Sequence, residues 1–488
     1  MNTPEEQTQA EDINILLEVK NLSVAFTTSK GTVQAVKNVS FNLYKGETLG
    51  IVGESGSGKS VTSLAILGLV QKGVGKITSG EIIFHSPKIG KVNLLQLSEA
   101  QMRKDIRGND IAMIFQEPMT SLNPVYTCGE QVIETILLHQ VLTKEEAKKR
   151  VLELFEKVKL PDPLRIFRAY PHEISGGQKQ RVMIAMALSC QPALLIADEP
   201  TTALDVTVQA EVIKLIQELR DEFGMAVMFI THDLGVIAEI ADHIMVMFRG
   251  EVMENNETWP LFYQPQHPYT KGLLACRPRN DMKMNRLLVV GDFMQINENG
   301  EITENQKYGS IGDALVKSLE TEDEIIDRKK ELSMQNKPVL EVKNVKKYFP
   351  TKYKGWFKRE VVEYKKAVDD VSFNVYAGET LGLVGESGCG KTTLGRMLLN
   401  LISPTEGEVI YNGRNIFDLK AEEMRALRKD MQIIFQDPYS SLNPRLTVGE
   451  AIMEPMKIFG IGNNDKERKE KVIDLLETVN LKAQHFTH

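Results

Sequence analysis

Short apolar runs alternate with longer amphipathic stretches along the first half of the chain. The apolar runs cover residues 16–26, 39–43, 48–52, 111–115, 193–197 and 226–230. Several of them are followed directly by polar residues, as is typical of strands buried in a parallel sheet. Residues 130–158 instead repeat apolar positions at helical spacing, with lysines and glutamates on the outward positions. The alternation predicts an α/β core with a helical insertion between residues 116 and 175.

The pattern restarts in the second half, which makes the chain an internal repeat of domain size. LEVKNLSVAF at 17–26 matches LEVKNVKKYF at 340–349, and residues 46–59 agree with 378–391 at 12 of 14 positions. MIFQEPMTSLNP at 113–124 likewise matches IIFQDPYSSLNP at 433–444.

The repeat predicts four regions along the chain. They are a polar tail at 1–14, a complete domain at 15–278, a linker with the tail of that domain at 279–337, and a second domain at 338–488. The linker is acidic and has no long periodic run, although LLVV at 287–290 is compatible with a short strand.

Composition limits the classes of protein to which the chain can belong. Its 488 residues, 42% of them hydrophobic, are enough for two or three domains with proper cores. A net charge of −7 gives no overall positive field that would favour nucleic acid. The four cysteines are scattered without a CxxC pair, which suits a reducing compartment better than disulfides or a metal cluster. The acidic N-terminus does not resemble a signal peptide, and no apolar run is long enough to cross a bilayer.

Two glycine-rich loops carry the clearest chemistry. GESGSGKS at 53–60 and GESGCGKT at 385–392 both fit GxxxxGK[ST], in which backbone amides surround phosphates, the lysine reaches the outer oxygens and the last hydroxyl binds Mg²⁺. The predicted ATP-binding residues of these loops are Gly53, Glu54, Ser55, Gly56, Ser57, Gly58, Lys59, Ser60, Gly385, Glu386, Ser387, Gly388, Cys389, Gly390, Lys391 and Thr392. The chain is therefore predicted to be a tandem ATPase that uses ATP and Mg²⁺.

Further motifs in the first copy, together with this loop, resemble the nucleotide-binding domains of ATP-binding cassette (ABC) transporters. They are ISGGQKQR at 174–181, LLIADE at 194–199, PTTALD at 200–205 and His232 after an apolar strand. The resemblance implies an α/β fold of two P-loop NTPase (ABC ATPase) domains in tandem. Each would have a RecA-like core, an antiparallel β subdomain and a helical subdomain.

The resemblance also implies a role for each motif residue. Glu199 would orient or deprotonate the attacking water, His232 would touch the γ-phosphate, and Gln116 would sense both Mg²⁺ and water. The implied Mg²⁺ ligands are Ser60, Gln116, Asp198, Thr392 and Gln436. The implied signature residues are Ser175, Gly176, Gly177 and Gln178, with Asp205 in the loop that contacts the other domain. Phe26 and Phe349 occupy the adenine-stacking position, where plain core packing is the alternative and Tyr348 is a competitor in the second copy.

Other segments narrow the resemblance to one group of importers. FQEPMTSLNP, AYPHEISGGQ and QHPYTKGLL resemble the ATPases of oligopeptide, dipeptide, nickel and glutathione importers. The HPYT residues themselves suggest no catalytic role. Some members carry a cysteine cluster after this segment, but Cys276 stands alone, so no iron–sulfur cluster is expected. The implied partners are two transmembrane permease subunits and, indirectly, a solute-binding protein, with the ATPase peripheral on the cytoplasmic face of the bacterial inner membrane.

Two alternatives to the importer remain at this point. A soluble tandem cassette protein acting on ribosomes or DNA would share the ATP motifs, but such chains typically have a long basic linker or zinc-binding cysteines, and this chain has neither. A P-loop kinase or GTPase would not explain ISGGQ or the repeat. Nucleic acid is therefore not an expected partner.

The second copy carries no signature motif within the chain. Ser175 follows Ser121 by 54 residues, and the same spacing from Ser441 reaches position 495, beyond His488. Family members place ATP between the loop of one domain and the signature of the other, so neither composite site is expected to be complete within one chain. We therefore expect the sequence to be part of a longer protein with paired domains.

Overall fold

The computed structural model describes residues 14–28, 31–71, 73–116, 121–202, 204–278, 283–297, 300–305, 307–334, 337–354, 360–436 and 441–488. The chain divides into two compact units, Met1–Glu324 and Ile325–His488, and each is described by itself. No helix of the described residues is long and apolar enough to span a membrane.

The first unit begins with an antiparallel sheet in the order β2-β1-β4-β5. Its strands are β1 (Ile15–Thr28), β2 (Gly31–Tyr44), β4 (Gly75–Ser86) and β5 (Gly90–Asn93). After β5 follow η1 (Leu94–Gln96), α3 (Glu99–Gln101) and the short helix η2 (Met102–Ile106). β1 and β4 approach so closely at Gly80 (φ +109°) that a Cβ there would lie 2.7 Å from the Leu22 Cα atom. Glycine is therefore required at this crossing.

The core of the first unit is a six-stranded sheet in the order β10-β9-β3-β8-β7-β6. The strands are β3 (Thr48–Val52), β6 (Ile111–Ile114), β7 (Leu194–Asp198), β8 (Ala226–Thr231), β9 (His243–Phe248) and β10 (Glu251–Glu257). All pairings are parallel except β9 with β10. Alternate residues of β7 face opposite sides, because Leu195 packs in one apolar cluster and Ile196 in the other. Both faces are covered, as the uninterrupted apolar runs predicted.

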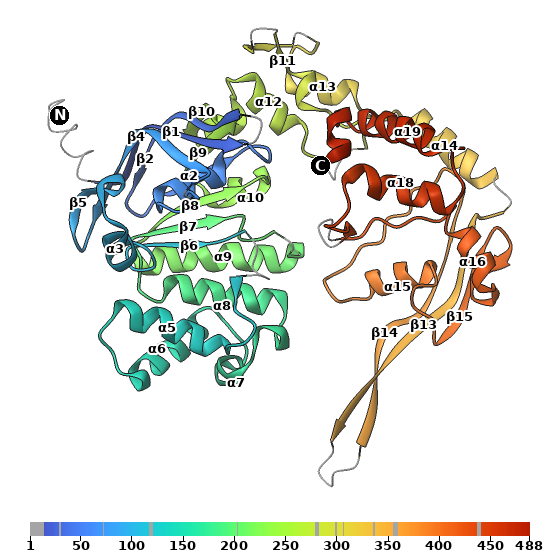
Figure 1. Cartoon of the computed structure of the whole chain (residues 1–488), viewed down its shortest axis with the longest axis horizontal. Helices are drawn as coiled ribbons and strands as arrows, with labels where there is room; N and C mark the ends of the chain where they lie inside the picture. Colours follow the sequence, from blue (N-terminus) through green and yellow to red (C-terminus); the bar gives the residue numbers. More distant parts are fainter. Residues whose placement is uncertain are drawn as a thin grey trace. The chain divides into compact units, whose positions relative to one another are not determined.

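Helices cover the core sheet and form a separate subdomain. The sheet is flanked by α2 (Lys59–Ile66), α9 (Val206–Phe223) and α10 (Leu234–Ile240). The subdomain consists of α5 (Cys128–His139), α6 (Lys144–Lys157), α7 (Pro163–Arg168), η3 (Pro171–Glu173) and α8 (Gly176–Leu188). Figure 1 shows α5, α6 and α7 grouped at the end of the unit away from the antiparallel sheet. Capping boxes start α5 at Thr127 and α6 at Thr143, and the helical insertion predicted between 116 and 175 is confirmed.

The region after β10 folds onto the first unit. It contains α11 (Thr258–Tyr263), α12 (Pro268–Ala275), η4 (Val290–Asp292), β11 (Met294–Ile296), β12 (Ile302–Glu304) and α13 (Ile311–Lys317). The next helix, α14 (Glu322–Met334), begins at the end of the first unit and lies mostly in the second. Leu288, Phe293 and Ala314 form a small apolar cluster with Ala275 at the end of α12. The strand considered at 287–290 is wrong, since residues 287–289 have no regular structure and Val290 begins η4. The run is only four residues long. Leu288 packs in this cluster and Val290 against the main core, while Leu287 and Val289 are exposed.

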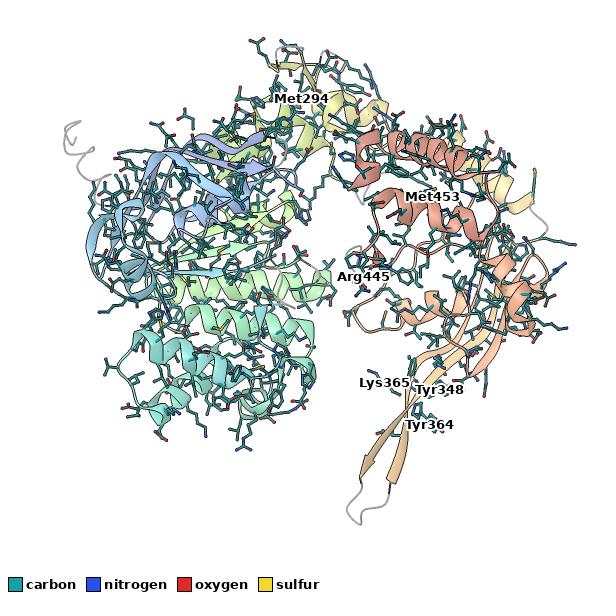
Figure 2. The ribbon with its side chains drawn as sticks, in the orientation of Figure 1. Met294, Tyr348, Tyr364, Lys365, Arg445 and Met453 are labelled. Atoms are coloured by element: carbon teal, nitrogen blue, oxygen red, sulfur yellow. The ribbon has the colours of Figure 1, made fainter. Side chains whose placement is uncertain are left out.

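The second unit contains its own antiparallel sheet, in the order β14-β13-β15-β16. Its strands are β13 (Leu340–Lys354), β14 (Glu360–Val375), β15 (Glu406–Tyr411) and β16 (Arg414–Asn415). Its helices are α15 (Lys391–Leu398), η5 (Ile416–Asp418), α16 (Ala421–Leu427), α18 (Val448–Ile458), α19 (Asp465–Thr478) and η6 (Ala483–Thr487). Figure 2 shows Tyr348, Tyr364 and Lys365 along the β13–β14 ribbon. The tandem α/β fold class is confirmed, but residues 380–384, which correspond to β3, form no strand.

Candidate functional site

The first glycine loop leads from the end of β3 into α2. Lys59 Nζ donates hydrogen bonds to the carbonyl oxygens of Gly53 (2.7 Å) and Glu54 (2.8 Å) and lies 3.4 Å from the Ser57 hydroxyl. Gly53 has φ +152°, and a Cβ there would lie 2.2 Å from the Met247 carbonyl oxygen. The loop therefore follows a path that only glycine permits at this point, and it holds the lysine ammonium over its own backbone.

Lys59 lies in an unusual environment for a lysine, because only 5% of its surface is exposed. Burial lowers the pKa of its ammonium, and the nearby carboxylates of Glu199 and Asp198 oppose that shift. A buried cation beside exposed amides and a helix N-terminus favours the binding of an anion with several negative charges, such as a nucleotide phosphate chain.

Ser60 and Asp198 form the part of the site that fits Mg²⁺. The Ser60 hydroxyl donates a hydrogen bond to Asp198 Oδ1 at 3.1 Å. Burial raises the pKa of Asp198, which is the last residue of β7, and the hydrogen bond from Ser60 opposes this. Mg²⁺ prefers oxygen ligands and is commonly held by one or two protein oxygens together with phosphates and water. The described residues contain no cluster of three or more His, Cys, Asp or Glu side chains that could hold a metal.

Glu199 follows Asp198, and its side chain contacts Gln116, Thr202 and His232. Its carboxylate accepts hydrogen bonds from Gln116 Nε2 (3.0 Å) and the Thr202 hydroxyl (3.0 Å), and its Oε1 lies 3.3 Å from His232 Nδ1. Its backbone N–H donates to the Ile230 carbonyl at 2.9 Å. The residue has φ +47°, a left-handed conformation that costs a non-glycine residue about 1–3 kcal/mol. Such strain at a buried turn is typical of functional sites.

The structure thus brings together the predicted residues Gln116, Asp198, Glu199 and His232 beside the first loop. Sequence reasoning missed Thr202, although it lies in the PTTALD motif three residues after Glu199. A hydroxyl three residues beyond a carboxylate can reach it across a turn, and that spacing was the available signal.

The signature residues lie elsewhere on the first unit. Ser175 is the N-cap of α8, where its hydroxyl accepts from the Gln178 N–H at 3.3 Å and its own N–H donates to Gln178 Oε1 at 3.1 Å. Ser175 and Gly176 are exposed, and among the described residues no hydrogen bond links either of them to the first loop. A Cβ on Gly177 would lie 3.0 Å from Val208 Cγ1.

Asp205 is the N-cap of α9, and its Oδ1 accepts the Val208 N–H at 3.0 Å. The amides at the start of α8 therefore face solvent on a helix N-terminus, while Asp205 orders the loop beside it.

The predicted adenine-stacking residues have different environments in the two copies. Phe26 is half-buried beside Val70, and a Cβ on Gly75 would lie 2.7 Å from its ring. Phe349 is 39% exposed, with Lys347 Nζ 5.2 Å from its ring centroid. The competing Tyr348 donates its hydroxyl to Asp369. Its side chain points to the opposite face of β13 from that of Phe349, because the two are consecutive strand residues.

The second loop repeats the geometry of the first. Lys391 Nζ donates to the carbonyl oxygens of Gly385 and Glu386, and it lies 3.5 Å from Cys389 Sγ. Gly390 has the same φ of +103° as Gly58. Among the described residues of the second unit, no carboxylate forms a hydrogen bond with Thr392 or Gln436, the two residues predicted to bind Mg²⁺ there. In this described part of the chain, the second loop therefore has no counterpart of the Ser60–Asp198 contact.

These features define a P-loop nucleotide hydrolase: a phosphate loop at the end of the parallel strand β3, a hydroxyl–carboxylate pair formed by Ser60 of the loop and Asp198 at the end of β7, and a strained carboxylate beside them. The family model described as ABC transporter matches residues 36–202 and 368–488. The chain belongs to the ABC transporter family and is one of its ATPases.

Curated relatives agree with this assignment. The chain is 46% identical over 475 residues to the glutathione import ATP-binding protein GsiA of Salmonella typhimurium, covering 97% of this chain and 72% of the relative. It is 45% identical over 474 residues to GsiA of Escherichia coli O157:H7, with the same coverage. The solved dimer of MJ0796, a bacterial ABC transporter cassette, is 31% identical and aligns with 50% of this chain and 99% of its own, at a TM-score of 0.44.

Proposed function

We propose that this chain is the ATP-hydrolysing subunit of a bacterial importer for small peptides, with a glutathione-like solute as the first candidate. The observation that carries the proposal is the convergence of Gln116, Thr202 and His232 on the Glu199 carboxylate, beside the Ser60–Asp198 pair. The solute is suggested by the 46% identity to a glutathione import ATP-binding protein.

In the proposed mechanism, Lys59 and the loop amides bind the outer phosphates of ATP. Ser60 and Asp198 would hold Mg²⁺, which neutralises charge that develops on the γ-phosphate oxygens. Glu199 orients a water molecule in line with the γ-phosphate and accepts its proton at the carboxylate. Gln116, Thr202 and His232 hold that carboxylate in place, so its orientation is fixed before the water attacks the γ-phosphate.

The exposed start of α8 suggests how the site is completed. Ser175 and the amides of Gly176 and Gly177 would contact the γ-phosphate bound to the loop of an opposing cassette domain, as a helix N-terminus favours. ATP binding would then draw two cassette domains together, and hydrolysis would release them. Two permease subunits would receive this movement and hold the ATPase at the cytoplasmic face of the inner membrane, and a solute-binding protein would deliver the solute.

The relatives do not favour the alternative of a soluble cassette protein acting on ribosomes or DNA. Both reported relatives are import ATP-binding proteins, and they match over 97% of this chain, including the acidic region between the two copies.

The proposal is tested by Glu199→Gln. The amide keeps the size of the side chain but cannot accept a proton, so we expect ATP turnover to fall at least about 100-fold. Equilibrium binding of Mg-ATP to the first loop should stay within about threefold, because Lys59, Ser60 and Asp198 are retained. Steady-state phosphate release and nucleotide titration would measure the two quantities.

The measurement uses a Lys391→Ala background, so that only the first loop is read. Glu222→Gln is the matched control, because Glu222 is an exposed carboxylate that pairs with Lys157 on the surface. An unchanged turnover rate in the Glu199→Gln variant would reject the proposed role.

A further inference from the structure

The QHPYT segment, to which the sequence assigned no chemistry, is fixed to the core sheet through its backbone. Glu254 of β10 accepts the N–H of Gln266 through Oε1 and the N–H of His267 through Oε2, each at 3.0 Å. A carboxylate that accepts two consecutive amides is a strong local restraint, because both hydrogen bonds are charge-assisted. The chain therefore enters α12 at a defined position and angle.

His267 then sets the start of α12. Its Nδ1 accepts the Tyr269 N–H at 3.1 Å, so the ring acts as the N-cap of the helix. Burial lowers the pKa of His267, which favours the neutral ring that this acceptor role requires. Pro268 occupies the first helical position, where its fixed φ suits a helix and its missing N–H costs nothing.

Tyr269 is consequently directed into the core, toward the first phosphate loop. Its side chain is fully buried, and its ring lies against Phe248 with the centroids 4.5 Å apart. Its hydroxyl accepts the Glu54 N–H at 3.1 Å. Burial raises the pKa of Tyr269 to about 12, so the group stays a neutral phenol at any physiological pH.

The hydrogen bond matters because of the peptide unit that it holds. The Glu54 N–H and the Gly53 carbonyl belong to the same planar peptide group. Tyr269 fixes the N–H end of this group, while the carbonyl end accepts Lys59 Nζ at 2.7 Å. Rotation of the peptide plane would therefore break both contacts. Gly53 itself has φ +152° and no side chain to restrain it.

The second loop offers a natural comparison without this anchor. Lys391 contacts the equivalent carbonyls of Gly385 and Glu386, but no tyrosine in the described part of the chain accepts a hydrogen bond from the Glu386 N–H. The geometry can thus form without the anchor, and the role of the anchor is to restrain it.

We propose that Tyr269 is a positioning residue of the first nucleotide site, which holds the Gly53–Glu54 peptide plane and thereby the phosphate loop in its binding conformation. The inference rests on the proposed nucleotide site. The proposal assigns a function to the QHPYT segment. Glu254, His267 and Pro268 fix the position of α12, and the Tyr269 hydroxyl, which this helix holds in place, restrains the phosphate loop. The loop is therefore tied to the region after β10, because α12 also packs against η4 and β12.

The test is Tyr269→Phe in a Lys391→Ala background, which confines nucleotide binding to the first loop. Phenylalanine keeps the ring against Phe248 and removes only the hydroxyl. We expect hydrogen exchange at the Glu54 amide of the nucleotide-free protein to become at least about fivefold faster, as loss of a hydrogen bond worth about 1 kcal/mol implies. The dissociation constant for Mg-ATP should rise about three- to tenfold, with a smaller change in kcat than in KM.

Tyr263→Phe is the matched control, since Tyr263 on α11 is exposed and stacks on Trp259. It should change neither Glu54 exchange nor nucleotide affinity. The inference is overturned if Tyr269→Phe leaves both quantities unchanged. It is also overturned if exchange rises equally throughout the first unit, because that result means general destabilisation. Glu54 exchange is read without nucleotide, so failure of the proposed function would show separately as absent ATP binding in the unsubstituted protein.

Discussion

The two copies contain nearly the same five-residue segment in two different states. TLGIV at 48–52 forms the fully buried strand β3, whereas TLGLV at 380–384 forms no strand and is exposed. Val52 is 1% exposed and Val384 is 93% exposed. The following apolar segment behaves in the same way, since Ile114 of β6 is 1% exposed while Ile434 is 100% exposed.

The difference follows from what surrounds each segment. β3 is hydrogen-bonded between β8 and β9, which come from residues 226–248 of the first copy. In the described second unit, no strand pairs with residues 380–384. Strand formation in a parallel sheet therefore depends on non-local partners, even when the local sequence is almost unchanged.

The two phosphate loops, unlike these strand segments, have the same conformation in both copies. Gly56 and Gly388 have φ values of +79° and +81°, and both lysines bind the same two backbone carbonyls. The loop conformation is set locally by its glycines and lysine, whereas the catalytic site needs residues from distant strands. We therefore expect both loops to bind phosphate, whereas the residues placed for hydrolysis within the described structure lie beside the first loop.

The largest expected effect comes from placing a charge in each copy of the strand. Val52→Asp buries an unpaired carboxylate between two strands and should destabilise the first unit by about 4 kcal/mol or more. Val384→Asp should change stability by less than about 0.5 kcal/mol, because the side chain is already exposed. Hydrogen exchange of the β3, β8 and β9 amides, together with urea unfolding, would measure this. Equal destabilisation by the two substitutions would contradict the claim that this segment is buried only in the first copy.

A second prediction concerns the lysines. Lys59→Ala and Lys391→Ala should each weaken Mg-ATP binding at their own loop by about 10- to 100-fold, since each removes a charge-assisted contact worth about 1.5–3 kcal/mol. Titration of each single variant should show loss of one class of site and retention of the other. Equal affinity in the unsubstituted protein and the double variant would contradict the identification of the phosphate loops.

The smallest expected effect is on the alkylation rate of Cys389, the cysteine that occupies a serine position of the first loop in the second loop. Cys389 is exposed, while Cys128 and Cys276 have pKa values raised to about 11 by burial. At pH 8 we expect alkylation of Cys389 to be at least about tenfold faster than that of the other thiols, because the thiolate is the reactive form. Mg-ATP should slow this reaction by occupying the loop. Peptide mass spectrometry would follow each thiol, with Cys389→Ser as the control, and an ATP-independent rate would count against nucleotide binding by the second loop.

Much of the first unit could be predicted from the sequence. Residues 48–52 were predicted as a strand and are β3, and the apolar run at 193–197 lies within one residue of β7 (Leu194–Asp198). Glu199, Gln116 and His232 were brought together only through the family resemblance, because their contacts join residues up to 83 positions apart.

The sequence could not show two other features. Residues 380–384 have strand-like composition, but composition does not reveal whether neighbouring strands exist. The Tyr269–Glu54 hydrogen bond spans 215 positions, and its donor is a backbone amide that no side-chain pattern marks.

We expect the catalytic residues of one cassette domain and the signature of an opposing cassette domain to form one ATP site at the interface between them. Residues 1–488 contain SGGQ once, at 175–178, so in a preparation of this polypeptide the first loop can meet a signature only if two copies pair through their first units. The ATPase rate of the unsubstituted chain should then rise more steeply than linearly with protein concentration, in parallel with dimer formation seen by light scattering.

The most direct measurement mixes two inactive variants, Glu199→Gln and Ser175→Asp. Aspartate retains the N-cap of α8 but places a negative charge against the γ-phosphate. In a symmetric pair, the mixed dimer has one site that combines an intact Glu199 with an intact Ser175, so the mixture should recover about a quarter of the unsubstituted rate. If each site lay within a single chain, the mixture would stay as inactive as its components at every concentration, and that result would contradict the account.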